Sequence, residues 1–198
     1  MQPYSHAIFG NRRLLLASAS PRRRELLGLI GIDVVTVPLQ NIDESYPSVL
    51  SPAEVPEYIS RKKAAAYTHP LAPEEILVTA DTVVINNGSV LGKPADEFEA
   101  ARMLALLSGH AHSVVTGVTL VTSSGSISFS DTTHVEFADL SEEEIAYYIN
   151  NYHPLDKAGA YGIQEWIGYI GVKGICGDYY NVMGLPLRKL YEHIRALD

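Results

Sequence analysis

The chain has 198 residues, of which 46% are hydrophobic and 19% are charged, so it is too apolar and too weakly charged for a disordered protein. A formal net charge of −8 argues against a general nucleic-acid-binding protein, which would normally be basic. The sequence contains neither an apolar run long enough to span a membrane nor the pattern of a secretory signal. We therefore expect a soluble cytoplasmic protein that binds neither nucleic acid nor a membrane.

Apolar runs and turn residues predict alternating strands and helices in the first half of the chain. Ser20 followed by Pro21 indicates a helix start, because serine caps free amides and proline lacks one. Ser51 and Glu54 have the spacing of a capping box that opens a second helix. The expected elements are a strand over 14–17, a helix over 21–30, a strand over 33–37, a helix over 52–67, and a strand over 76–80 that ends at Asp81.

The second half continues this alternation. Asn87-Gly88 between two apolar runs predicts a hairpin turn, and Asp96 with Glu99 predicts another helix start. The expected elements are a helix over 96–107, strands over 113–122 and 127–137, a helix over 141–150, mostly loop with one or two strands over 152–185, and a last helix over 186–196. Because no regular βαβ rhythm emerges, we expect an α/β fold with a mixed sheet flanked by helices.

Several common signatures are incomplete. The segment from Gly88 to Pro94 is similar to a phosphate-binding loop, but it has three residues instead of four between its glycines and ends in proline. Cys176 is the only cysteine, which excludes an internal disulfide, and it is interpreted as a small packed residue. His110 and His112 lack the partners of a zinc site and are interpreted as strand-edge residues.

The basic residues near the N-terminus form the first candidate site. Segment 18–24 follows a buried strand and enters a helix N-terminus, which offers free N–H groups and the positive end of the helix dipole. Ser18 and two or three arginines of this segment would complete a phosphate clamp, since guanidinium groups match phosphate oxygens. An ordinary capped basic helix is the alternative interpretation.

Carboxylates and lysines further along the chain form a second set of candidates. Asp81, beside Thr82, can hold a divalent cation or take a proton from water, and Glu44 could supply a second metal oxygen. Lys63 and Lys93 around such a pair would be typical of a triphosphate site. A turn aspartate, a loop acid and solvated lysines are the alternative.

A third candidate is the segment 156–164, DKAGAYGIQ. Gly159 and Gly162 allow a flat ligand to approach the backbone closely, and Gln164 offers an amide edge for hydrogen bonding. A flexible surface loop is the alternative.

Together and in this order, these segments resemble the Maf family of nucleoside triphosphate pyrophosphatases. The matching stretches are LLLASASPRRRELL (14–27), RKKAAA (61–66), TADTVV (79–84), LGKP (91–94), LSGHAHSVVTGV (107–118), SEEEI (141–145), DKAGAYGIQ (156–164) and DYYNVMGLP (178–186). The resemblance implies one domain over 1–198, with 1–13 as an N-terminal extension. It also implies an inosine triphosphatase-like α/β fold, with an elongated mixed sheet flanked by helices and two lobes around a central cleft.

The resemblance implies a reaction as well. The α–β bond of a nucleoside triphosphate is hydrolysed to a monophosphate and pyrophosphate with a divalent metal ion, usually Mg²⁺, with Mn²⁺ or Co²⁺ as alternatives. By position, Asp81 matches the family's proton-accepting aspartate, and Arg22, Thr82 and Gln164 match positions associated with substrate choice. The remaining matches to polar groups of the family's cleft are Ser18, Arg23, Glu44, Lys63, Lys93 and Asp156, with Glu44 and Asp81 on the metal side.

Arg22, Thr82 and GAYGIQ resemble the subgroup that acts on dTTP and UTP, rather than the one that prefers 7-methyl-GTP. This implies a house-cleaning role in nucleotide metabolism, including modified pyrimidine nucleotides, and allows a homodimer. The sequence departs from many members at Glu165-Trp166, where they have Gly-Arg. The resemblance therefore does not define the rim of the base pocket. The alternatives are a non-enzymatic nucleotide-binding regulator of cell division and a pyrophosphatase for purine or damaged nucleotides.

Overall fold

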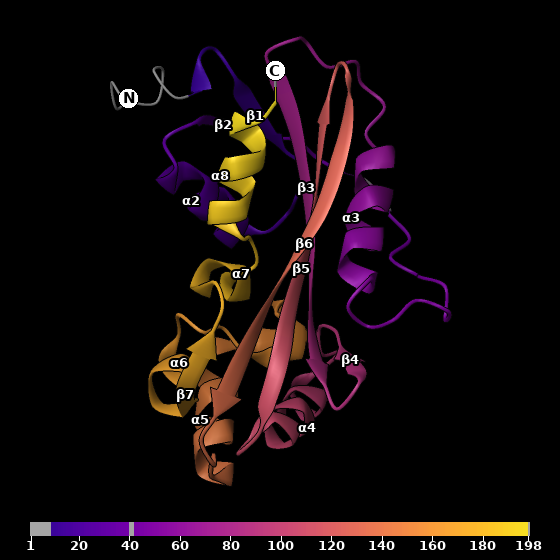
Figure 1. Ribbon diagram of the computed structural model, residues 1–198. Coiled ribbons are helices and arrows are strands. Elements are labelled where there is room, and N and C mark those ends of the chain that lie inside the picture. The colour runs from indigo at the N-terminus through magenta and orange to yellow at the C-terminus, as the bar shows by residue number, and fades with distance from the viewer. Residues whose placement is uncertain (1–8, 40–41, 198) are drawn as a thin grey trace. The chain divides into compact units, whose positions relative to one another are not determined.

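The computed structural model describes residues 9–39 and 42–197 (Figure 1). Within these ranges the chain packs as two compact units, which are described separately. Unit 1 contains the described residues up to Asp81 together with 116–131 and 184–197, and unit 2 contains 82–115 and 132–183. The expectations of a single domain and of a cleft between two lobes stay predictions.

The described strands form one seven-stranded mixed sheet in the order β2-β1-β3-β5-β6-β7, with β4 paired to β3. They are β1 (Arg13–Leu16), β2 (Asp33–Thr36), β3 (Glu75–Asn86), β4 (Ser89–Leu91), β5 (Ala111–Thr122), β6 (Gly125–Phe137) and β7 (Val172–Cys176). β1 runs parallel to β2 and β3, whereas β4 is antiparallel to β3 and β7 is antiparallel to β6. This arrangement, together with the helices, confirms the expected α/β class with a mixed sheet.

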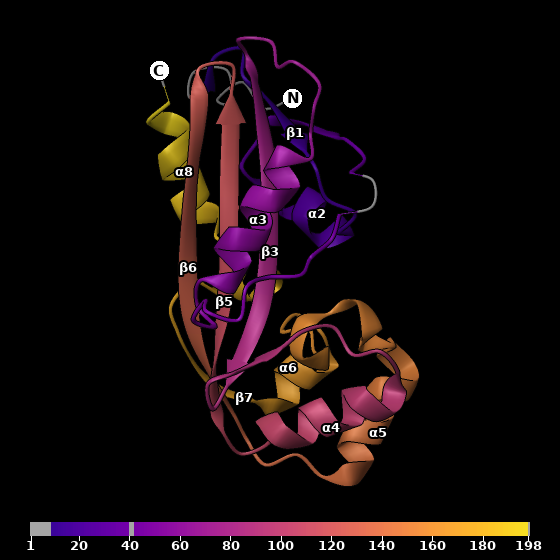
Figure 2. The same cartoon turned by 90° about the vertical axis from the view of Figure 1, so that its right-hand side faces the viewer.

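Helices accompany the strands in both units. They are α2 (Pro21–Leu29), α3 (Val55–Ala65), α4 (Glu97–Leu107), α5 (Glu142–Tyr152), α6 (Trp166–Gly171), α7 (Tyr179–Met183) and α8 (Leu187–Arg195), with 3-10 helices η1 (Pro154–Asp156) and η2 (Ala158–Ala160). In unit 1, α3 and α8 lie on either side of the strands (Figures 1 and 2). In unit 2, the buried core includes Leu104 of α4, Phe137 of β6 and Tyr148 of α5. No helix in the described ranges is long and apolar enough to cross a membrane.

The capping residues predicted for two helices are confirmed, and the helix expected from residue 141 is capped in the same way. Ser20 accepts a hydrogen bond from the Arg23 amide at the start of α2. Asp96 accepts one from the Glu99 amide, 2.7 Å away, at the start of α4. Ser141 opens α5 with both bonds of a capping box in place. These starts were predictable because each bond joins residues only three positions apart.

Two predictions outside the strands were wrong. α3 begins at Val55 instead of residue 52, because the amide and hydroxyl of Ser51 both donate to the Glu54 carboxylate and close a turn before the helix. The segment 152–185, expected to be mostly loop, contains α6 and α7 as well as β7. Packing rather than helix propensity places α6: a Cβ on Gly168 would lie 1.9 Å from the Ile163 carbonyl oxygen.

β3 is longer than predicted, so Asp81 lies within the strand and not at its end. The strand continues to Asn86 because Val83 and Val84 are also buried against the core. Asp81 is itself buried, which requires a compensating group. The Lys63 ammonium provides one, at 2.8 Å from Asp81 Oδ1.

Two burial predictions were also wrong. Cys176, interpreted as packed, is exposed at the end of β7. His112, interpreted as a strand-edge residue, is buried in β5, with its Nε2 in a 2.8 Å hydrogen bond with the Tyr161 hydroxyl. The alternation along β5 does not reveal this, because β5 is buried along most of both faces.

The burial of His112 predicts a pH-dependent stability. Burial lowers the pKa of His112 to about 4, whereas the unfolded chain takes up this proton near pH 6.5. The free energy of unfolding therefore keeps its full value above about pH 6.5 and decreases as the pH drops toward 4. At pH 4.5 the decrease is about 2–3 kcal/mol. Urea unfolding at pH 7.5 and 4.5 measures this loss, which His112→Gln should reduce and the exposed-site control His110→Gln should not. Equal losses in the wild type and His112→Gln would contradict the assignment.

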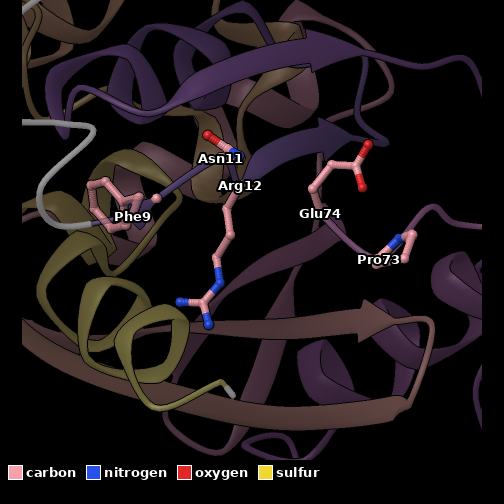
Figure 3. Close-up of a pocket in the computed structure, with 6 residues that line it drawn as sticks. Phe9, Asn11, Arg12, Pro73 and Glu74 are labelled. Carbon is pink, nitrogen blue, oxygen red and sulfur yellow. The ribbon is translucent and has the colours of Figure 1, made fainter.

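The described end of the predicted N-terminal extension packs on α8. The Phe9 ring is buried and meets Tyr191 edge to face, with centroids 5.7 Å apart. The Arg12 guanidinium donates to the carbonyls of Ile194, at 3.0 Å, and Leu197. A pocket of about 480 Å³ lies beside Phe9 and Arg12. Figure 3 shows the side chains that line it. Its lining consists of Phe9, Gly10, Asn11, Arg12, Pro73 and Glu74. None of these is a predicted site residue, so the pocket is not the predicted nucleotide site.

Candidate functional site

Unit 1 places two carboxylates around one lysine. Lys63 Nζ lies 2.8 Å from Asp81 Oδ1 and 2.8 Å from Glu44 Oε1. The side chains of Lys63 and Asp81 are each 13% exposed, whereas that of Glu44 is 50% exposed. The ammonium compensates the like charges of the two acids. Of the four residues that sequence analysis grouped together, Asp81, Glu44 and Lys63 are in contact in unit 1, whereas Lys93 belongs to unit 2.

Buried hydroxyl groups set the position of Lys63 opposite Asp81. Thr79, two residues before Asp81 on β3, donates to the backbone carbonyl of Ser60 at 2.7 Å. The Ser60 hydroxyl in turn forms a 2.8 Å hydrogen bond with the hydroxyl of Thr119 on β5. Ser60 and Lys63 are three positions apart and share a face of α3. These contacts, which sequence analysis missed, tie the lysine-bearing face of α3 to the strand that carries Asp81.

The loop that carries Glu44 is anchored by the neighbouring lysine. Lys62 Nζ donates to the Ser45 carbonyl at 2.8 Å and lies 3.3 Å from Asp43 Oδ2. Hydrogen bonds from the side chain and amide of Ser45, then from Lys62, lower the pKa of Asp43 to about 2. Lys62 and Lys63 thus bind consecutive residues of one loop. Their adjacency in the sequence was visible, but their different partners were not.

Arg23 of the predicted phosphate clamp makes hydrogen bonds within unit 1. Arg23 Nε donates to the Gly184 carbonyl at 2.9 Å, and its Nη1 donates to the Ala80 carbonyl at 2.8 Å and to Ser18 Oγ at 3.4 Å. Burial lowers the pKa of Arg23, an effect that the charge of Asp81 opposes. Arg23 therefore connects α2 to the residue before Asp81. Arg22, next to it on α2, is half-buried.

Unit 2 contains the other predicted residues. Thr82 is half-buried on β3, and Lys93 is exposed in the turn after β4. That turn contacts the DKAGAYGIQ loop, because the Gly159 amide donates to the Gly92 carbonyl at 3.0 Å. Gly159 has a φ of +67°, and a Cβ there would lie 2.8 Å from Val84 Cγ2, so the position requires glycine.

Asp156 is exposed, but its neighbour Lys157 is buried and links two acids. Lys157 Nζ lies 2.8 Å from Asp156 Oδ1 and 3.2 Å from Glu165 Oε1. Sequence analysis named Asp156 and missed Lys157 and Glu165 as partners. A lysine beside several glycines and apolar residues was the available signal, since a buried ammonium needs a carboxylate.

Gln164 is half-buried at the end of the DKAGAYGIQ loop. Its side-chain oxygen is buried and has no hydrogen-bond partner within the described ranges. Its backbone carbonyl accepts from the Tyr169 hydroxyl. A buried acceptor without a partner carries a desolvation cost.

The carboxylates of unit 1 fit a divalent cation that binds together with a phosphate ligand. Within the described ranges, no group of three or more His, Cys, Asp or Glu side chains is placed to hold a metal ion. Asp81 and Glu44 supply two oxygen-donor side chains, and proteins usually hold Mg²⁺ through one or two carboxylates plus substrate phosphates. The donor set thus suits a metal that arrives with its substrate.

Comparisons with known proteins identify relatives of this chain. The family model described as Maf-like protein matches residues 13–197. A Bacteroides thetaiotaomicron protein named dTTP/UTP pyrophosphatase is 55% identical over 185 residues, covering 93% of this chain and 96% of its own. A Phocaeicola vulgatus protein of the same name is 53% identical with the same coverage. A solved HAM1 protein from Coxiella burnetii covers 94% of this chain and 100% of its own at 13% identity, but its TM-score of 0.48 is too low to establish a shared fold.

Proposed function

Since the chain belongs to the Maf family, we propose that it is a nucleoside triphosphate pyrophosphatase that hydrolyses dTTP and UTP. The products are the nucleoside monophosphate and pyrophosphate. Relatives more than half identical over nearly their whole length carry the name dTTP/UTP pyrophosphatase, which supports this substrate class. These relatives favour neither a non-enzymatic regulator nor a purine pyrophosphatase.

The observation that carries the proposal is the cluster of Asp81, Lys63 and Glu44. Hydrolysis of a triphosphate requires an activated water and the neutralisation of about four negative charges, so positioning and electrostatics supply most of the catalysis. In the proposal, Asp81 accepts the proton of the attacking water. Lys63 places one positive charge beside it, and the contacts of Ser60 and Thr79 fix that geometry.

The proposed metal is Mg²⁺, with Mn²⁺ and Co²⁺ as alternatives. Asp81 and Glu44 would hold it, and it would supply charge neutralisation to the phosphates. Ser18, Arg22 and Arg23 in unit 1 provide further phosphate-binding groups. Ser18 and Arg23 lie where α2 offers its N-terminal amides to an anion.

The groups of unit 2 receive the remaining roles in the proposal. Lys93 contributes positive charge, and Thr82 with Gln164 contributes to substrate choice. Uracil and thymine both present an N3–H between two carbonyls, and an amide side chain such as that of Gln164 can pair with an adjacent donor and acceptor. The proposal includes a cytoplasmic, house-cleaning role toward pyrimidine nucleotides. A homodimer stays a prediction, which size-exclusion chromatography with light scattering would test.

A nucleotide panel tests the function through the position of the cleaved bond. With Mg²⁺ present, the protein should convert dTTP to dTMP and UTP to UMP, each with one equivalent of pyrophosphate. EDTA should abolish the activity, because without the metal ion the carboxylates of Asp81 and Glu44 repel the phosphates. Chromatography of the nucleotides together with pyrophosphate detection identifies the products. Formation of dTDP and inorganic phosphate as the main products would contradict the assignment.

A further inference from the structure

Glu165 directly follows Gln164, and its carboxylate joins two parts of unit 2. Glu165 Oε1 lies 3.2 Å from the ammonium of Lys157, which belongs to the DKAGAYGIQ loop. Its Oε2 accepts a hydrogen bond from the hydroxyl of Tyr148, which belongs to α5. One carboxylate therefore connects the loop to the helix beneath it.

The same tyrosine also binds the loop backbone. The Gly162 amide donates to the Tyr148 hydroxyl at 3.0 Å. Tyr148 is fully buried, and burial followed by the Glu165 contact raises the pKa of its hydroxyl, which stays protonated. The hydroxyl can therefore donate to Glu165 while it accepts from Gly162. A phenylalanine at position 148 would lack both contacts.

Gly162 and Glu165 enclose Gln164 in a tight turn. The Glu165 amide donates to the Gly162 carbonyl at 3.0 Å. A Cβ on Gly162 would lie 2.8 Å from the carboxyl carbon of Glu165, so the absence of a side chain lets the carboxylate approach the backbone. A turn hydrogen bond and the close approach of the Glu165 carboxylate to Gly162 thus flank Gln164 on its two sides.

Lys157 depends on Glu165 for its compensation. The Lys157 side chain is 8% exposed, and its two partners differ in solvation: Asp156 is 56% exposed and Glu165 is 20% exposed. A buried ammonium is costly unless a nearby carboxylate compensates it. Glu165 is the less solvated partner, so its loss would leave Lys157 with only the more exposed carboxylate of Asp156.

We propose that Glu165 is a positioning residue that holds the backbone of the DKAGAYGIQ loop around Gln164 and so strengthens discrimination between uracil and cytosine. The inference rests on the proposed function, in which Gln164 recognises the base. Cytosine presents an acceptor at N3 and an amino group, the reverse of the uracil edge, and a freely turning amide would rotate to suit it. A loop that limits the Gln164 amide to one orientation instead leaves polar groups unpaired when cytosine binds.

Trp166 provides a binding signal independent of catalysis. It is the only tryptophan of the chain and directly follows Glu165. Its ring centroid lies 4.7 Å from that of Tyr147. Titrations monitored by its fluorescence would use the α,β-methylene analogues of UTP and CTP with Mg²⁺, because their α–β bridge is not hydrolysed. Steady-state kinetics with UTP and CTP would run in parallel.

Glu165→Gln keeps the side-chain shape and removes the charge. We expect it to reduce the UTP-over-CTP ratio of kcat/KM by about fivefold or more. The ratio of the binding constants of the two analogues should fall by a similar factor. The change should arise mostly in KM, with kcat for UTP nearly unchanged. Tyr148→Phe, which removes the hydroxyl shared by Gly162 and Glu165, should act in the same direction. The control is Glu136→Gln, which breaks an exposed 2.8 Å pair with Lys173 and should leave both ratios unchanged.

The outcomes separate the inference from the proposed function. A wild-type protein that neither binds the analogues nor hydrolyses UTP would overturn the proposed function and the inference with it. A wild type that discriminates, together with a folded Glu165→Gln that keeps both ratios within about twofold, would overturn the inference alone. If Glu165→Gln does not fold, a folded Tyr148→Phe with wild-type ratios would overturn it equally. Equal losses for UTP and CTP would assign Glu165 a purely structural role.

Discussion

Asp81→Asn is expected to lower kcat for dTTP by about 10²–10⁴-fold, the usual contribution of a positioned general base. The amide has nearly the shape of the carboxylate, and its oxygen can still accept from Lys63, so the β3–α3 contact should survive. What is lost is the proton acceptor and one of the two metal-side charges. Pyrophosphate release under saturating dTTP and Mg²⁺ measures the effect.

The matched control for this variant is Asp33→Asn, which changes an exposed aspartate of β2 in the same unit. It should retain the wild-type rate. Circular dichroism and thermal unfolding would show that both variants are folded at the assay temperature. If folded Asp81→Asn kept more than about a tenth of the wild-type kcat, Asp81 would be a structural residue within β3 and another group would have to activate the water.

Lys63→Gln should lower kcat/KM for dTTP by about 10²-fold or more, the typical effect of removing one group that stabilises developing charge. The ammonium is the group shared by Asp81 and Glu44, at 2.8 Å from each. Without it the triphosphate meets two uncompensated acids, which opposes binding and catalysis together. Initial rates over a range of dTTP concentrations separate the effects on kcat and KM.

Arg61→Gln is the control for this second variant, because Arg61 is an exposed residue of the same helix that pairs with Glu57 one turn away. It removes one positive charge from α3 without touching the cluster and should keep kcat/KM near the wild-type value. Lys63→Gln should also unfold at a lower temperature, since Asp81 is then buried without its partner. A folded Lys63→Gln with a loss below about tenfold would restrict Lys63 to a structural role.

The chemical groups of the candidate site could be predicted from the sequence, but the contacts that position them could not. Asp81, Lys63 and Glu44 were identified as chemical groups because their residue types suit metal and phosphate chemistry, and the structure places all three together. Arg23 was predicted as a phosphate ligand, but its guanidinium also contacts carbonyls of Ala80 and Gly184. No spacing rule links positions 23, 80 and 184, so these contacts were not predictable.

The sequence by itself determined the local features of this protein. The starts of α2, α4 and α5 and the Asn87-Gly88 turn follow from hydrogen bonds and dihedral preferences within three or four residues, and the alternating apolar pattern predicted most strands. The motifs also sufficed to identify the family. All of these depend on neighbours along the chain.

Only the tertiary structure decided which polar groups meet. The continuation of β3 past Asp81, the burial of His112, and the contacts of Glu165 with Lys157 and Tyr148 all depend on the packing of segments far apart in the sequence. A carboxylate has the same local propensity whether it faces water or a buried ammonium. Its environment, and therefore its chemistry, is set by desolvation and by partners that come together only when the core forms.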